Sequence, residues 1–242
     1  MNSMTKFSTC LLCSLLLLVS ACASRPANEG GNSNAAPASS GSTGGGFSAA
    51  AISENDKPLD VMTKAMRAQL DAKSYRAHVT NTTGDGMTSH MLIEYAAPDR
   101  YRMTTEAQGG SAGKGFKMEY VIVSGATYIK TPESGWVKSP VDARPMINAF
   151  RDPKMLDELA KTSDIKLVGP DTLDGAPMLV YEYTQNNPMG MKLKNTARTW
   201  LSVADGLPRK TETEGEFNGT KTKTHITMSD YNADIKIESP VK

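Results

Sequence analysis

The sequence has no excess of charge of either sign and very little cysteine. Its 27 lysines and arginines face 26 aspartates and glutamates, which gives a formal net charge of +1. Domains that bind nucleic acid carry a basic patch, and the sequence suggests none, which argues against a nucleic-acid partner. The three cysteines, Cys10, Cys13 and Cys22, all lie near the N-terminus. The domain that follows them is therefore expected to lack disulfides and to depend on its hydrophobic core.

Long apolar runs are also missing after residue 21. From Phe7 to Ala21 the chain is mostly Leu, Ser and Cys, preceded by one basic residue, Lys6. A spanning helix needs about 20 apolar residues, and this shorter segment is typical of a signal peptide. It ends in Val19-Ser20-Ala21-Cys22, which resembles the lipobox of bacterial lipoproteins. An ordinary secretory signal and a short anchor helix are the alternatives.

The lipobox resemblance has consequences for location. It implies that residues 1–21 are removed as a signal peptide and that Cys22 carries a diacylglycerol, often with a further acyl group. Two or more acyl chains hold a protein stably at a membrane. The protein is then expected in a bacterial cell envelope, facing the periplasm or the exterior. In such lipoproteins an Asp after the lipidated cysteine is linked to the inner membrane. Here Ala23 follows, which favours an outer membrane where one exists.

The rest of the chain divides into a linker and one domain. Residues 22–55 are rich in Ala, Gly, Ser, Asn and Pro and cannot bury enough apolar surface to fold, so we expect a flexible tether. A domain is expected over residues 56–242. It begins with a helix, for which Asp56 is the predicted N-cap and Pro58 lies in the first turn. The apolar residues of this helix recur at helical spacing: Leu59, Met62, Met66 and Leu70.

After Ser74 the apolar residues alternate with polar ones, which predicts strands with one apolar face. Tight-turn sequences such as Asp174-Gly175 separate these strands. Two short helices are expected between Val141 and Lys161, inserted in the middle of the sheet. The predicted fold is mainly β (α+β). It is an incomplete antiparallel β-barrel of ten or eleven strands whose N-terminal helix and mid-chain helical insertion cover the concave face.

Four segments, in this order, resemble the LolA/LolB/LppX-like superfamily over about residues 57–242. They are Tyr95-Ala96-Ala97-Pro98-Asp99-Arg100-Tyr101-Arg102-Met103; Leu167-Val168-Gly169 with Asp174-Gly175 and Tyr181-Glu182-Tyr183; Trp200-Leu201-Ser202 with Asp205-Gly206-Leu207-Pro208; and Ser229-Asp230-Tyr231 with Ile235-Lys236-Ile237, which resembles the closing strand. The resemblance implies an unclosed barrel whose apolar hollow holds acyl chains of lipoproteins, glycolipids or acylglycerols.

Catalytic and metal-binding patterns are weak. Ser111 lies in a G-x-S-x-G sequence, but it is not preceded by an apolar strand and followed by a helix, as a lipase nucleophile would be. The histidines, His78, His90 and His225, have no metal-ligand spacing and are expected on the solvent face of strands. We therefore expect no enzyme activity, no metal and no cofactor.

The sequence favours a membrane-tethered protein that binds acyl chains of lipids or lipoproteins for transport or sorting. Methionine is flexible and polarizable, which suits an adaptable apolar site, although core filling is the simpler role for any one of them. The residues expected to line the cavity come from the helix and the apolar strand faces: Leu59, Met62, Met66, Leu70, Tyr75, Met91, Ile93, Tyr95, Met103, Met118, Tyr120, Leu179 and Tyr181. The alternatives are an envelope-stress sensor of the same fold, which would bind an envelope protein, and a structural lipoprotein with a filled core.

Overall fold

The computed structural model describes residues 50–109, 115–144, 163–186, 194–217 and 219–241. The signal peptide, Cys22, Ser111 and most of the predicted linker lie outside these ranges. So does the predicted helical insertion, apart from residues 141–144.

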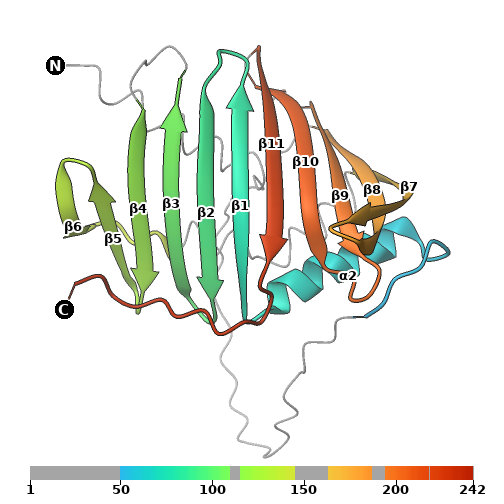
Figure 1. Cartoon of the computed structure of the whole chain (residues 1–242), viewed down its shortest axis with the longest axis horizontal. Helices are drawn as coiled ribbons and strands as arrows, with labels where there is room; N and C mark the ends of the chain where they lie inside the picture. Colours follow the sequence, from blue (N-terminus) through green and yellow to red (C-terminus); the bar gives the residue numbers. More distant parts are fainter. Residues whose placement is uncertain (1–49, 110–114, 145–162, 187–193, 218, 242) are drawn as a thin grey trace, which may run out of the picture.

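Eleven antiparallel strands form one sheet in the described part of the chain, in agreement with the predicted ten or eleven (Figure 1). The strands are β1 (Ser74–Thr83), β2 (Thr88–Ala96), β3 (Arg100–Gln108), β4 (Phe116–Val123), β5 (Ala126–Thr131), β6 (Ser134–Lys138), β7 (Ser163–Leu173), β8 (Ala176–Asn186), β9 (Lys194–Ser202), β10 (Pro208–Phe217) and β11 (Thr220–Ser229). The sheet is not closed, because its order runs from β6 at one edge to β7 at the other.

The sheet consists of two meanders joined in the middle. Strands β1 to β6 pair with their neighbours in sequence, as do β7 to β11, and β1 pairs with β11. Tight turns set the register of the hairpins. At the β7–β8 turn, Asp174 and Gly175 both have positive φ angles of 50° and 80°, as a two-residue hairpin turn requires. Ser124 and Gly125 do the same between β4 and β5.

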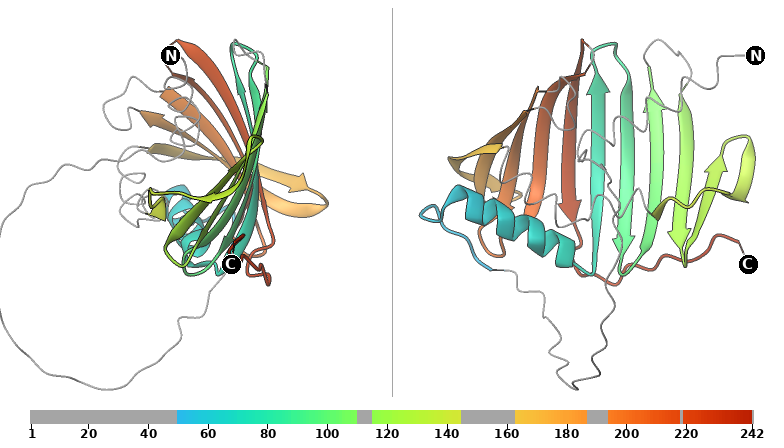
Figure 2. Two further views of the ribbon diagram at one scale, coloured as in Figure 1. Left: turned by 90° about the vertical axis from the view of Figure 1, so that its left-hand side faces the viewer. Right: turned by 180° about the vertical axis from the view of Figure 1, so that it is seen from behind.

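One face of the sheet is covered in part by helix α2 (Pro58–Asp71), and we call it the inner face. Figure 2 shows α2 lying across one end of the C-terminal strands on this side. Its side chains Val61, Met62 and Ala65 are buried against Leu179, Tyr181 and Leu201 of β8 and β9. The helical lid predicted from the sequence is therefore present in its N-terminal part.

Two details of this helix differ from the sequence prediction. Its N-cap is Lys57, which makes no side-chain cap, and the Asp56 carboxylate instead accepts a hydrogen bond from the backbone of Ser53 in the preceding turn. Leu59 is 40% exposed. At about 100° per residue, Leu59 points about 200° away from the buried Val61, so both cannot face the sheet.

Ordered contacts begin before the predicted domain boundary at residue 56. Ile52 is 8% exposed and packs in the cluster under α2, and its backbone N–H donates to the Val203 carbonyl at 3.1 Å. A single isoleucine at the end of a polar, glycine-rich stretch gives no periodic signal, so the sequence could not place it in the core.

The outer face carries ion pairs and the C-terminal tail. Beyond Ser229 the chain leaves the sheet and runs along one end of β1 to β4 (Figure 1). Ile235 and Ile237 pack there on Val121 and Val123 of β4. The expectation of a closing strand at Ile235–Ile237 is therefore wrong, because β2 and β11 already occupy both edges of β1.

Charged side chains cover much of the remaining outer face. Glu94 accepts from Arg76 and Arg102, and Lys117 bonds Glu106 at 2.6 Å across neighbouring strands. The three histidines are on this face as predicted. Each is next in sequence to an inner-face residue of its strand, and successive side chains point to opposite faces. The outer face is thus the solvated side of the sheet.

Candidate functional site

Cross-strand pairing arranges the inner-face residues of β1 to β5 in four rows. Val79 can be followed through its cross-strand partners on β11, β10 and β9 to Tyr181 on β8, and directly paired residues point to the same face. Tyr181 contacts α2, so these rows lie on the inner face. The first row is Tyr75, Tyr95, Tyr101 and Ile122; the second is Ala77, Ile93, Met103, Tyr120 and Ile129; the third is Val79, Met91, Thr105 and Met118; the fourth is Asn81, Ser89, Ala107 and Phe116.

The first row is a packed ladder of aromatic rings. The ring centroids of Tyr75 and Tyr95 are 5.3 Å apart, and those of Tyr95 and Tyr101 are 5.0 Å apart. Rings at these distances attract one another beyond their simple burial. Tyr95, Tyr101 and Ile122 are buried, so this end of the inner face is closed.

The second and third rows form a half-buried apolar area. We name it the inner apolar surface, and it consists of Met91, Ile93, Met103, Met118, Tyr120 and Ile129. None of these side chains is fully buried. The Tyr120 hydroxyl donates to the Met118 sulfur at 3.6 Å, and burial raises the pKa of Tyr120, so the phenol is neutral at physiological pH. The area is uncharged and adaptable in shape.

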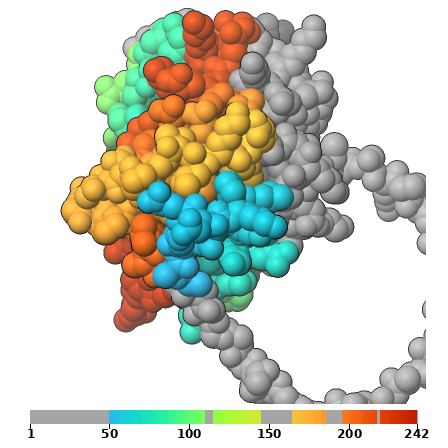
Figure 3. Space-filling view, turned by 90° about the vertical axis from the view of Figure 1, so that its right-hand side faces the viewer, coloured from blue at the N-terminus to red at the C-terminus, as the bar shows by residue number. Residues whose placement is uncertain are grey.

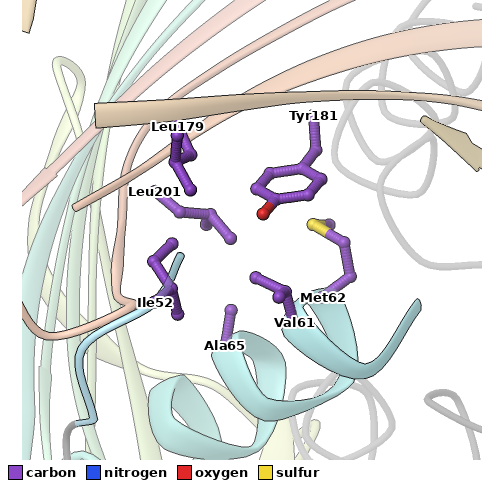
Figure 4. Close-up of a cluster of buried hydrophobic side chains, with 7 residues drawn as sticks. All are labelled: Ile52, Val61, Met62, Ala65, Leu179, Tyr181 and Leu201. Atoms are coloured by element: carbon purple, nitrogen blue, oxygen red, sulfur yellow. The ribbon is translucent and has the colours of Figure 1, made fainter. Parts of the chain in front are cut away.

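The C-terminal strands present a different inner face. Leu179, Tyr181 and Leu201 point toward Val61, Met62 and Ala65 of α2 (Figure 4). Burial, with smaller contributions from the nearby Asp56 and Glu54 charges, raises the pKa of Tyr181. Figure 3 shows the segment around α2 packed directly on the β7–β8 hairpin. The inner face of β8 and β9 next to α2 is therefore a closed protein core.

The residues predicted to line a cavity separate into three groups. Seven lie together on the first three rows: Tyr75, Met91, Ile93, Tyr95, Met103, Met118 and Tyr120. Met62, Leu179 and Tyr181 belong to the α2 core, with Met66 and Leu70 partly buried on the helix. Leu59 is exposed and belongs to neither group. That the first group lines a ligand cavity stays a prediction.

Sequence reasoning missed several inner-face residues. Tyr101 and Ile122 continue the tyrosine row, and Ile129 extends the inner apolar surface onto β5. The alternation of apolar residues on β3 and β4 was already a signal for the first two. It also missed the buried polar residues of the fourth row and its neighbours, because Asn, Ser and Thr on a strand usually indicate the solvated face.

The buried polar group is centred on Asn81 in β1. Asn81 and Ser89, which lie opposite each other, are both buried, and the Asn81 Oδ1 accepts a hydrogen bond from the Thr224 hydroxyl of β11 at 3.0 Å. Thr199 and Thr211 exchange a further hydroxyl contact at 3.1 Å on β9 and β10. Of these uncharged polar groups, Asn81 and Ser89 lie next to the inner apolar surface.

The described residues contain no group of three or more His, Cys, Asp or Glu side chains that could hold a metal ion. In these ranges no helix has the length and apolar character needed to cross a membrane.

Comparison with known proteins gives a structural match only. The sequence matches no family model and no protein of curated function. The structure matches LprF from Mycobacterium bovis with a TM-score of 0.55 and 13% identity, covering 76% of this chain and 96% of LprF. It matches the lipoprotein LppX of Mycobacterium tuberculosis with a TM-score of 0.51 and 13% identity, covering 74% and 97%. The chain therefore has the fold of LprF and LppX, which is the fold that the resemblance in its sequence implies.

Proposed function

We propose that this protein is a bacterial envelope lipoprotein that binds acyl chains of lipids or lipoproteins on its inner apolar surface, for transport or sorting. The observation that carries the proposal is that Met91, Ile93, Met103, Met118 and Tyr120, on the inner face of β2 to β4, are only partly buried. Helix α2 closes the same face over β8 and β9. An apolar area left partly uncovered inside a sheet marks a binding surface better than a core.

The physical basis of binding is apolar burial. Removing apolar surface from water stabilises a complex by about 25 cal/mol per Å². Methionine side chains adapt to flexible chains of varied shape, and such a site holds its ligand without directional bonds, which allows exchange. The proposal is therefore one of binding rather than catalysis. The shared fold with LppX, a lipoprotein, supports it.

The membrane anchor completes the proposal. Cys22 carries the lipid after residues 1–21 are removed, and the glycine- and alanine-rich residues that follow act as a flexible tether. A linker of about 30 such residues has a root-mean-square length of roughly 30 Å, which keeps the domain close to the membrane that supplies its ligand. Ala23 favours the outer membrane as the site of anchoring.

The test is native mass spectrometry of the purified mature chain, with extraction of bound lipid, for the wild type and two double variants. Met91→Asp with Met118→Asp places two carboxylates beside Thr105 on the inner apolar surface. Leu92→Asp with Thr104→Asp is the matched control, because these paired residues are half-buried on the outer face of the same sheet. Thermal unfolding of both variants measures the cost to stability.

We expect acyl lipid on the wild type and the outer-face control, and its loss from the inner-face variant at comparable stability. A wild-type protein that carries no lipid and takes up none would contradict the proposal and favour a filled structural core. Retention of lipid by the inner-face variant would place the site elsewhere. Capture of an envelope protein in place of lipid would support the sensor alternative.

A further inference from the structure

Asn81 has an unsatisfied hydrogen-bond donor in a buried position. The residue is 4% exposed. Its Oδ1 accepts from the Thr224 hydroxyl, whereas no described residue accepts from its Nδ2. Because a buried amide N–H without a partner destabilises a protein by about 1–3 kcal/mol, such groups in native structures need an explanation.

The position of Asn81 suggests what accepts from this donor. Asn81 begins the fourth inner row, next to the third row, which contains Met91 and Met118. Residues two apart on a strand are separated by about 7 Å, so the donor lies about one row from the inner apolar surface. Contact with both requires the side chains that enclose the amide to shift, so that a polar atom of the ligand reaches Asn81 while its apolar chain lies over the methionines.

The charges near Asn81 decide which kind of polar atom a ligand can place there. Around Asn81 the inner-face positions carry Ser89, Thr224 and Thr213, none of which is acidic or basic. The charged Arg209 of β10 lies near the tyrosine row instead, where it stacks on Tyr231 and pairs with Asp205. A charged headgroup buried at Asn81 would lack a counter-ion among the inner-face residues around it, and its desolvation would oppose binding. A neutral acceptor such as a carbonyl oxygen satisfies the amide without that penalty.

We propose that Asn81 Nδ2 donates a hydrogen bond to the ester carbonyl oxygen of an uncharged acyl lipid whose chain lies on the inner apolar surface. The Thr224 hydroxyl is a positioning group, since its bond to Oδ1 fixes the orientation of the amide. This inference rests on the proposed function and adds to it a specificity-determining residue.

The experiment compares an ester with an ether. The probes are dioleoylglycerol, which has two ester carbonyls, and the corresponding dioleyl glycerol ether, which has the same chains and no carbonyl. Binding to the delipidated mature chain, with Cys22→Ser so that no attached acyl chain competes, is measured for the wild type, Asn81→Leu and Thr224→Val. Leu replaces Asn with a side chain of similar size that cannot donate. Thermal unfolding checks that each variant is folded.

The wild type is expected to bind the ester about tenfold more tightly than the ether, as one buried hydrogen bond provides. Asn81→Leu should bind both probes equally, with ether affinity unchanged, and Thr224→Val should reduce the preference. Equal binding of both probes by the wild type would overturn the Asn81 anchor and leave the proposed function standing. Persistence of the preference in a folded Asn81→Leu variant would also overturn it. Binding of neither probe would count against both proposals.

Discussion

The inner face of the sheet differs between its two meanders, although both alternate apolar and polar residues. On β8 and β9 the inner-face residues Leu179, Tyr181 and Leu201 are almost fully buried under α2. On β2 to β4 the corresponding residues, such as Ile93 and Met103, are only half-buried. Alternation therefore identifies an apolar face, and what covers that face decides whether it becomes core or binding surface.

Strand β4 sharpens this comparison, because two of its outer-face residues are better buried than two of its inner-face residues. Val121 and Val123 are covered by the C-terminal tail, whereas Met118 and Tyr120 on the inner side stay half-buried. The N-terminal meander thus obtains part of its stability from the outer face. Its partly buried inner face is where we propose that the ligand binds.

The largest effect is expected from truncation in the α2 core. A buried Leu→Ala substitution lowers the free energy of unfolding by about 2–5 kcal/mol. Leu201→Ala should lie near the upper end of this range, because Leu201 is fully buried. Ile93→Ala on the inner apolar surface should cost about half of that or less, since its side chain is already partly in water. Urea denaturation of the two variants measures the difference. Equal costs would mean that the two halves are packed alike.

A smaller effect is expected from the outer-face cover of β4. Ile237→Ala should lower the free energy of unfolding by about 2 kcal/mol, at the low end for a buried isoleucine because the terminal tail can shift to fill the space. Lipid uptake by the variant should equal that of the wild type, because Ile237 and Met118 lie on opposite faces of the sheet. Native mass spectrometry measures this, and reduced uptake would show that the two faces of β4 are coupled.

The smallest expected effect is on the pH dependence of stability, and it comes from Asp171 on the outer face. The Trp200 indole N–H donates to Asp171 at 2.7 Å and, with the Thr172 backbone N–H and the nearby Lys210 ammonium, holds the pKa of this carboxyl below its usual range. A carboxyl with a depressed folded pKa stabilises the protein above its unfolded pKa of about 4 and loses that contribution as pH falls.

The Asp171→Asn variant should therefore have a lower Tm than the wild type at pH 7, and the difference should disappear as pH falls below about 4. Thermal unfolding across this range measures it. Lipid uptake should not change between pH 5 and 8, because the inner apolar surface holds no group that titrates there. A Tm difference independent of pH would mean that the Asp171 charge contributes nothing.

The sequence by itself determined the local structure of this protein. Alternation with period two predicted the strands and their apolar faces, and Asp174-Gly175 predicted a hairpin turn because both residues tolerate positive φ angles. The order of these segments was sufficient to indicate the superfamily fold. The lipobox at Cys22, a purely local signal, predicts the anchor.

Only the tertiary structure decided what lies against each face. Which side of α2 is buried, how Ile235 and Ile237 pack on the outer face, and why Asn81 is enclosed all depend on contacts between residues far apart in the sequence. The periodicity of apolar residues in the sequence indicates which residues share a face. It does not record which part of the chain covers that face, because packing depends on long-range contacts that local patterns do not encode.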